Sequence, residues 1–180
     1  MEEIALHILD IIQNSIYAEG TFIELFIKED PMHNLFSFYV QDNGRGMTKE
    51  FIQKVKNPFY TTRTTRKIGL GIPLLEATCR QCNGELKIQS QIEQGTIIQA
   101  TMEYYHIDRP PLGDMSSTIV SILLSLDHQR FRYEHKYLDQ IFILDTKELQ
   151  EVLGDLSLQQ PEILQWIRQY VKDQLMKLTQ

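Results

Sequence analysis

The feature that most constrains the fold is a helical segment followed directly by two strand-like segments. In residues 4–18, apolar side chains recur at the spacing of one helix face: Ile4, Ile8, Ile11, Ile12 and Ile16. Apolar and polar residues then alternate in "TFIELFIK" (21–28) and "LFSFYVQD" (35–42), on either side of the turn-rich "EDPMHN". This alternation predicts an antiparallel hairpin, because a half-buried strand has a period of two residues.

Helical and irregular segments follow this hairpin. Thr48 can cap a short helix that runs to Val55, and residues 57–67 show no periodicity, which predicts a loop. A further helix is expected to begin near Gly71 and to end at Gly84, since glycine is the usual residue just after a helix.

Two more alternating segments come next, "ELKIQSQ" (85–91) and "GTIIQATMEYY" (95–105). The order is therefore helix, two strands, helix, loop, helix, two strands. This order predicts an α+β fold, a two-layer α/β sandwich in which helices cover one face of a mixed sheet.

The Pro/Gly-dense segment "HIDRPPLGD" (106–114) predicts a boundary between a first domain, residues 1–106, and a second segment, residues 107–180. The second segment contains patterns for a helix, two strands and two helices, and no chemical motif. We expect a small C-terminal α/β appendage that serves as a docking or dimerisation module, with a homodimer as one arrangement.

The chain carries 18 basic and 24 acidic residues, a formal net charge of -6. This balance argues against binding of nucleic acid, which requires a broad basic surface. Positive charge is nevertheless concentrated in one window that has no acidic residue: Lys54, Lys56, Arg63, Arg66 and Lys67. On charge alone, this window is equally well explained as a solvated loop or as a local site for a polyanion.

The N-terminus lacks the basic start and the cleavage site of a signal peptide, and no apolar run approaches the roughly 20 residues of a membrane span. We therefore expect a cytoplasmic protein without a membrane span. Cys79 and Cys82 form a CxxC inside a predicted helix, without the second ligand pair that a zinc site needs. We expect these two side chains to pack as small apolar groups.

Asp42 directly follows a predicted strand and begins the sequence "DNGRGM". Gly44 and Gly46 allow the backbone to turn tightly and to approach a ligand closely. Taken alone, this segment is also explained as a simple turn. The same two interpretations apply to Gly95-Thr96, where another strand begins after a turn.

Gly69-Leu70-Gly71 lies just before a predicted helix, whose free N–H groups and dipole favour phosphate oxygens. The chain contains no GxxxxGK[ST], which excludes a P-loop, and "GLGIPLL" lacks the third glycine of a dinucleotide motif. A phosphate site here would be of another kind.

His7, Asp10 and Asn14 form a polar stripe on the first predicted helix. Such a stripe is ordinarily solvated surface. The Asn14 side-chain oxygen is also a suitable ligand for Mg²⁺ that bridges phosphates, and Asp10 lies one turn earlier and faces the same way.

In this order and at these spacings, the motifs resemble those of the GHKL superfamily of ATP-binding domains, which includes gyrase, heat-shock chaperones, histidine kinases and MutL. The segment "DIIQNSIYAEGTFIEL" is similar to the Asn box in its MutL-type form, and "DNGRGM" to the first glycine box. The segment "NPFYTTRTTRKIGLGI" is similar to the lid and second glycine box of histidine kinases, and "EQGTIIQATM" to the closing Gly-Thr strand. The resemblance covers about residues 4–105 and implies the Bergerat-type ATP-binding fold.

The resemblance implies a site for ATP and Mg²⁺. Asn14 would ligate Mg²⁺, Asp42 would accept a hydrogen bond from the adenine amino group, and Thr96 would support the adenine end. The backbone at Gly44 and Gly46 would pass beside the base. The second glycine segment and the lid cations would face the phosphates: Gly69, Leu70, Gly71, Arg63, Arg66 and Lys67. The family pattern does not indicate which of the three cations reaches the β and γ phosphates.

The sequence departs from its ATP-hydrolysing relatives at Asp10, where they usually carry a glutamate that polarises the attacking water. Aspartate is shorter by one methylene, about 1.5 Å of reach, so weak hydrolysis is expected rather than fast turnover. Histidine kinases also carry a phosphoacceptor histidine on a separate helix, and since this sequence shows no such helix ahead of its nucleotide motifs, we do not expect a complete sensor kinase. We expect His7 to pack rather than to accept phosphate.

Three functions follow from this resemblance. The first is transfer of the γ-phosphoryl group to a Ser, Thr or His of a partner protein, as histidine kinases and anti-sigma-type kinases do. The second is a slow ATPase switch, and the third is ATP sensing without catalysis. Small proteins similar to this one stand beside hydrogenase or NADH-oxidoreductase subunits in anaerobic bacteria, so the resemblance implies a redox complex as the partner.

Overall fold

The computed structural model describes residues 3–56 and 71–179. Its α-helices are α1 (Ile4–Tyr17), α2 (Lys49–Val55), α3 (Gly71–Gln81), α4 (Met115–Ser125), α5 (Thr146–Leu153) and α6 (Pro161–Leu178). Its strands are β1 (Phe22–Asp30), β2 (Leu35–Asp42), β3 (Leu86–Gln91), β4 (Gly95–Glu103), β5 (Arg130–Tyr137) and β6 (Gln140–Asp145). A short 3-10 helix, η1 (Pro31–His33), lies in the β1–β2 connection.

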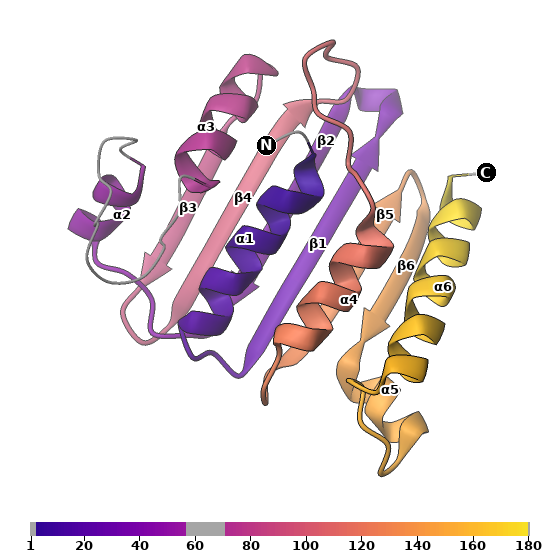
Figure 1. Cartoon of the computed structure of the whole chain (residues 1–180). Helices are drawn as coiled ribbons and strands as arrows, with labels where there is room; N and C mark the ends of the chain where they lie inside the picture. The colour runs from indigo at the N-terminus through magenta and orange to yellow at the C-terminus, as the bar shows by residue number, and fades with distance from the viewer. Residues whose placement is uncertain (1–2, 57–70, 180) are drawn as a thin grey trace.

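The described strands form one sheet in the order β3-β4-β2-β1-β5-β6 (Figure 1). All neighbouring strands are antiparallel except β1 and β5, which run parallel. The sheet is therefore mixed, as the sequence predicts. Both predicted hairpins are present, and the β2–β4 register places Asp42 opposite Thr96 at one end of the sheet.

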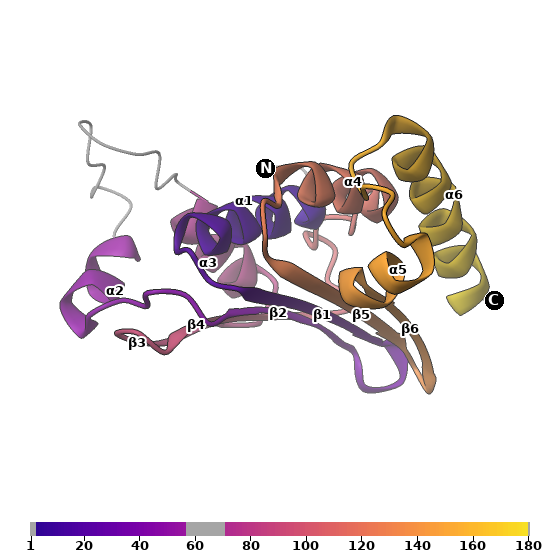
Figure 2. The same cartoon turned by 90° about the horizontal axis from the view of Figure 1, so that it is seen from below.

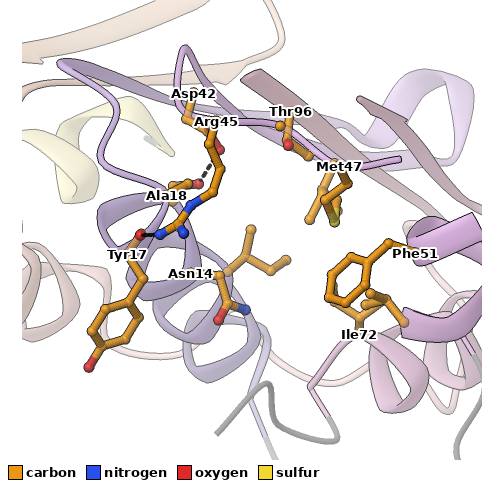
Figure 3. Close-up of a pocket in the computed structure, with 14 residues that line it drawn as sticks. Asn14, Tyr17, Ala18, Asp42, Arg45, Met47, Phe51, Ile72 and Thr96 are labelled. Atoms are coloured by element: carbon orange, nitrogen blue, oxygen red, sulfur yellow. Dashed lines mark hydrogen bonds between the residues drawn. The ribbon is translucent and has the colours of Figure 1, made fainter. Parts of the chain in front are cut away.

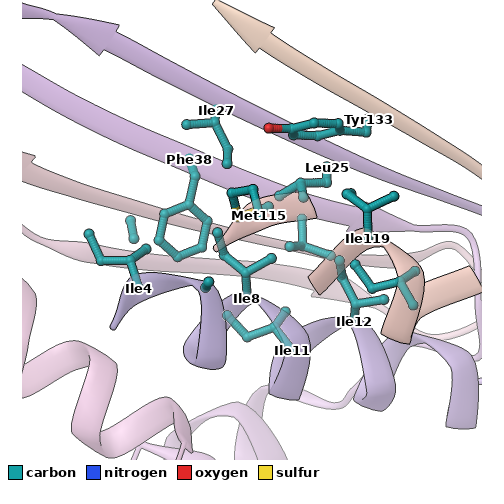
Figure 4. Packing of buried hydrophobic residues seen from close by; sticks show 14 of the residues in the cluster. Ile4, Ile8, Ile11, Ile12, Leu25, Ile27, Phe38, Met115, Ile119 and Tyr133 are labelled. Atoms are coloured by element: carbon teal, nitrogen blue, oxygen red, sulfur yellow. The ribbon is translucent and has the colours of Figure 1, made fainter. Parts of the chain in front are cut away.

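The helices lie on one face of this sheet and leave the other face open (Figure 2). The α1 residues Ile4, Ile8 and Ile12 are fully buried against the inner side chains of β1 and β2 (Figure 4). Burying one such side chain contributes about 1.5–3 kcal/mol. The two-layer α+β architecture predicted from the sequence is thus confirmed, and α1 packs directly on its core.

Local sequence signals fix the helix ends near that site. The Thr48 hydroxyl accepts a hydrogen bond from the Phe51 N–H at 3.1 Å, which satisfies one free donor at the start of α2. After α3, Asn83 adopts a positive φ and the Gly84 N–H donates to the Cys79 carbonyl. These contacts stop α3 at the place that the sequence indicates.

Residues 107–180 continue the same sheet. Strand β5 pairs with β1 along eight residues, and α4 packs beside α1. The carbonyls of Pro111 and Leu112 accept hydrogen bonds from the Ile4 and Ala5 N–H groups, at 3.0 and 2.8 Å. The segment after the predicted boundary is thus tied to the first helix, and the division of the chain into two functional parts stays a prediction.

Two negative expectations concern the part of the chain that the structure describes. No helix there is long and apolar enough to cross a membrane. Cys79 and Cys82 are buried free thiols, and burial raises the pKa of Cys79 to about 12. Together with other His, Cys, Asp or Glu side chains of residues 3–56 and 71–179, they form no cluster suited to a metal ion.

Candidate functional site

A cavity of about 450 Å³ opens between α1, α2, the start of α3 and the ends of β2 and β4 (Figure 3). This volume lies in the range of small-molecule sites. Most lining residues are apolar, and a few polar groups interrupt them: Ile11, Asn14, Ser15, Tyr17, Ala18, Asp42, Arg45, Gly46, Met47, Phe51, Val55, Ile72, Thr96 and Ile98.

Asp42 lies at the sheet end of this cavity and is only 6% exposed. Its Oδ2 accepts a hydrogen bond from the Ser15 hydroxyl at 2.7 Å, and its Oδ1 accepts one from the Gly44 N–H at 2.9 Å. Each carboxylate oxygen has two lone pairs. The fixed carboxylate therefore keeps acceptor capacity for an N–H group of a ligand.

The Ser15→Ala variant tests whether this contact orients Asp42. Loss of the hydroxyl removes one hydrogen bond of about 1 kcal/mol, so ligand affinity is expected to fall about five-fold. Calorimetric titration of the variant with ATP measures this effect. Ser117→Ala, on α4 and away from the cavity, is the matched control, and equal affinities for all three proteins would show that Asp42 needs no support from Ser15.

Thr96 faces Asp42 across the β2–β4 pair and lines the same cavity. Its hydroxyl lies 2.8 Å from the Ser90 hydroxyl, which also accepts a hydrogen bond from the Met47 N–H at 2.8 Å. Ser90 thereby connects the ends of β3 and β4 to the segment that follows Asp42. This network holds the polar end of the cavity in one geometry.

The two glycines after Asp42 allow neighbouring backbones to approach closely. Gly46 has φ +67°, and a Cβ at this position would lie 1.9 Å from the Gln91 carbonyl oxygen. A Cβ at Gly44 would lie 2.6 Å from the Ala18 carbonyl oxygen. Side chains at these positions would push the segment away from α1 and β3, so glycine is needed to shape this wall.

The remaining walls differ in chemistry (Figure 3). Met47, Phe51 and Ile72 gather on one side and present an apolar surface that suits the face of a planar ring. Asn14 and Arg45 come from the opposite side. The Arg45 guanidinium donates a hydrogen bond to the Tyr17 carbonyl. This bond connects the last turn of α1 to the segment between β2 and α2.

Asp10 and Gly71 meet beside the cavity, outside the residues that line it. A Cβ at Gly71 would lie 1.9 Å from Asp10 Oδ2, so the absence of a side chain lets the first residue of α3 lie against this carboxyl. Asp10 Oδ2 is buried and has no hydrogen-bond partner among the described residues. Burial raises the pKa of Asp10.

His7 lies one turn before Asp10 and is 1% exposed. Neither ring nitrogen has a hydrogen-bond partner within the described residues, and burial lowers the pKa of His7 from 6.5 to about 4. The polar stripe of α1 is therefore not solvated at this end. The expectation that His7 packs inside the protein agrees with this burial.

The His7 environment predicts a loss of stability in mild acid. The unfolded chain binds a proton at His7 below pH 6.5, whereas the folded chain binds it near pH 4, so stability that is complete above pH 6.5 falls as the pH decreases. At pH 5 the loss is about 2 kcal/mol. Urea unfolding at pH 7 and pH 5 is the measurement.

His7→Gln should remove this part of the pH dependence, and His128→Gln, at an exposed position, should retain it. A His7→Gln protein with the same decrease between pH 7 and pH 5 as the wild type would show that another group is responsible.

The structure brings together four of the predicted site residues around one cavity: Asn14, Asp42, Gly46 and Thr96. A fifth, Gly44, donates a backbone hydrogen bond to the Asp42 carboxylate. Asp10 and Gly71 are adjacent to it. The other predicted residues lie outside the described ranges: Arg63, Arg66, Lys67, Gly69 and Leu70. The role of each site residue stays a prediction.

Sequence reasoning missed Ser15, Ser90 and the apolar wall of the cavity. Ser15 follows Asn14 in the sequence, and its contact with Asp42 spans 27 residues, so no local pattern indicates it. Met47 directly precedes the N-cap of α2, and Phe51 lies in the first turn of that helix, just after the first glycine motif. This position is the signal that would have marked them as lining residues.

The family model of histidine kinase-, DNA gyrase B- and HSP90-like ATPases matches residues 2–106. This range is more than half of the chain, and the chain belongs to that family. The resemblance read from the Asn, glycine and Gly-Thr motifs is thereby confirmed.

Two curated relatives are kinases. Sporulation kinase C of Bacillus subtilis is 31% identical over 96 residues, which are 52% of this chain and 22% of that protein. The tetrathionate sensor histidine kinase TtrS of Salmonella typhimurium is 30% identical over 113 residues, which are 61% of this chain and 18% of that protein. The chain thus matches less than a quarter of the length of either relative.

A solved structure described as the N-terminal domain of a DNA repair protein has the same fold, with a TM-score of 0.58 and 13% identity. The match covers 88% of this chain and 59% of the other. The family model covers residues 2–106, which are 105 of the 180 residues. The structural match covers a larger share of the chain, so it extends into the segment after residue 106.

Proposed function

We propose that this protein binds Mg-ATP in the cavity and transfers the γ-phosphoryl group to a partner protein. The observation that carries this proposal is the fixed Asp42 carboxylate, which has free acceptor capacity at the end of a cavity with an apolar wall. The adenine amino group would donate to Asp42, and the ring would lie against Met47 and Phe51. Family membership and kinase relatives support the same ligand.

Mg²⁺ fits the residues on the Asn14 side of the cavity, opposite the apolar wall. The Asn14 amide oxygen is a ligand that this ion accepts, and the unpartnered Asp10 Oδ2 lies one turn away. When bound, Mg²⁺ would supply positive charge that offsets the negative charge of the phosphates. Asn14 would hold the ion, and the N–H groups at the start of α3 would face the phosphates. We propose that the residues before α3 contact the phosphates as well: Gly69 and Leu70 through their backbone, and Arg63, Arg66 and Lys67 through their positive charge.

In the proposed reaction, the acceptor oxygen or nitrogen of the partner forms a bond to the γ-phosphorus. The bond from that phosphorus to its bridging oxygen breaks, and ADP leaves. Asp10 would accept the proton of the acceptor group. Residues 1–106 would carry this site, and residues 107–180 would dock the partner protein.

One observation favours a second function, a slow ATPase switch or an ATP sensor. Asp10 lies against Gly71 and is not among the residues that line the cavity, so its reach to an attacking group is short. Incubation with γ-labelled ATP and extract of the source cell distinguishes the functions. Label on a partner protein supports the kinase, free phosphate alone supports the ATPase, and neither product supports the sensor.

The Asn14→Ala variant is expected to lose the Mg²⁺-dependent part of ATP binding, because it removes the proposed metal ligand. Titrations with and without Mg²⁺ in the wild type and the variant measure this difference. Gln13→Ala, at the exposed neighbouring position of α1, should bind as the wild type does. Equal Mg²⁺ dependence in Asn14→Ala and the wild type would remove Asn14 from the metal site.

A further inference from the structure

Asn43 follows Asp42 in the sequence, is exposed to solvent and is not among the residues that line the cavity. Its Oδ1 accepts hydrogen bonds from the Thr21 and Phe22 N–H groups, at 2.8 and 2.9 Å. Its Nδ2 donates a third hydrogen bond to the Thr21 hydroxyl at 2.9 Å. These bonds use most of the hydrogen-bonding capacity of an amide side chain, and they all go to the start of β1, more than 20 positions earlier in the chain.

The two segments that Asn43 connects both contribute to the cavity. Helix α1 and the turn after it supply one part of its lining, and residues 42–47 supply another. Two backbone hydrogen bonds join the same segments. The Arg45 N–H donates to the Ala18 carbonyl at 3.0 Å (Figure 3), and the Asn43 N–H donates to the Phe22 carbonyl at 3.4 Å. The Asn43 side chain therefore reinforces the contact that sets the distance between these two parts of the lining.

The contact also determines the surroundings of the Asp42 carboxylate. Asn43 lies between Asp42 and Gly44, whose N–H donates to Asp42 Oδ1 at 2.9 Å. A Cβ at Gly20 would lie 2.9 Å from Asn43 Oδ1 and 3.0 Å from the Gly44 nitrogen, so the turn after α1 packs directly against this peptide group. Because the Asn43 side chain is fixed to β1, the Gly44 N–H keeps one direction, and this direction holds the carboxylate in place.

We propose that Asn43 is a positioning residue for adenine recognition: its three hydrogen bonds hold the Gly44 N–H on the Asp42 carboxylate and so aim that carboxylate at the amino group of the base. This inference rests on the proposed function, because the adenine amino group is the ligand group concerned. Without the Asn43 side chain, the carboxylate accepts from the amino group with poorer geometry. A nucleotide without that amino group loses nothing, so the role of Asn43 lies in selectivity between nucleotides.

Calorimetric titration with ATP and with purine riboside triphosphate, which is ATP without the amino group, tests this selectivity. In Asn43→Ala, ATP affinity should fall about ten-fold, the effect of one or two hydrogen bonds, and the affinity for the second nucleotide should stay unchanged. Asn43→Asp should restore the wild-type ratio of the two affinities, because one carboxylate oxygen accepts from both N–H groups and the other accepts from the Thr21 hydroxyl. Asn34→Ala is the matched control, since Asn34 Oδ1 accepts from the Tyr105 N–H at 2.9 Å at the other end of β2, and it should keep the ratio.

Hydrogen exchange of the full chain without nucleotide tests the positioning in the absence of any ligand. The Gly44 N–H should exchange about ten-fold faster in Asn43→Ala than in the wild type, because the opening of this segment becomes easier. The Ile98 N–H, in the middle of β4, should exchange at the same rate in both proteins. Thr21→Val removes only the third hydrogen bond and should produce the same changes at a smaller size, which gives the result if Asn43→Ala does not fold.

Either an unchanged affinity ratio or an unchanged Gly44 exchange rate in a folded Asn43→Ala protein would overturn the proposal. An equal loss of affinity for both nucleotides would do so as well, since a general loss of structure produces that pattern. A wild type that binds no adenine nucleotide would contradict the proposed function. In that case the Gly44 exchange rate alone decides whether Asn43 positions this segment.

Discussion

Asp10→Asn is expected to lower the rate of phosphoryl transfer or ATP hydrolysis about 10²- to 10⁴-fold, the usual contribution of a general base, with ATP affinity nearly unchanged. The amide keeps the shape of the carboxyl group but cannot accept the proton of the attacking group. Burial raises the pKa of Asp10 above its ordinary value, which brings it closer to the pH at which a general base works best. Single-turnover experiments with labelled ATP measure the rate, and calorimetry measures the affinity.

The same variant has a second expected effect, on stability. Because the pKa of Asp10 is raised in the folded protein, folding becomes less favourable as the pH rises from below 3.8 through the raised value. At neutral pH the buried carboxylate thus costs stability, and Asp10→Asn should unfold at a higher temperature in the absence of nucleotide. Asp127→Asn, at an exposed position, is the control.

Full activity in Asp10→Asn would show that another residue activates the acceptor.

Asp42→Ala is expected to weaken ATP binding by about 2 kcal/mol or more, which is about 30-fold. The adenine amino group would lose its acceptor, and the Ser15 hydroxyl and the Gly44 N–H would lose theirs. Part of the effect is therefore structural, so thermal unfolding without nucleotide should accompany the titration. Gln41→Ala, at the preceding exposed position of β2, should bind ATP as the wild type does. Unchanged affinity in a folded Asp42→Ala protein would remove the adenine assignment.

Local patterns in the sequence were sufficient for most of the secondary structure and for the positions of Asp42 and Thr96 at strand ends. The alternation in residues 35–42 predicts β2, and the strand ends at Asp42, so the carboxylate is placed at the sheet end without knowledge of the tertiary structure. Thr96 follows in the same way from the turn before β4. Both positions depend on contacts between neighbours in sequence or within one hairpin.

Longer-range packing could not be predicted in this way. A polar stripe such as Asp10 and Asn14 is typical of a solvated helix face, and the packing of Gly71 against Asp10 shows that part of it is buried. Likewise, the strand pattern in residues 130–135 does not indicate a partner. That β5 pairs in parallel with β1, across more than 100 residues, depends on α4 crossing the sheet beside α1.

The central claim is that the cavity selects adenine nucleotides through Asp42, and calorimetric titration of the wild-type protein with ATP, ADP and GTP tests it most directly. Guanine carries a carbonyl oxygen where adenine carries its amino group, so an acceptor at Asp42 discriminates between them. ATP and ADP should both bind, and GTP should bind at least about 10-fold more weakly, since leaving a buried polar group unpaired costs about 1–3 kcal/mol. Binding of GTP as tight as that of ATP, or the absence of binding by either adenine nucleotide, would contradict the account.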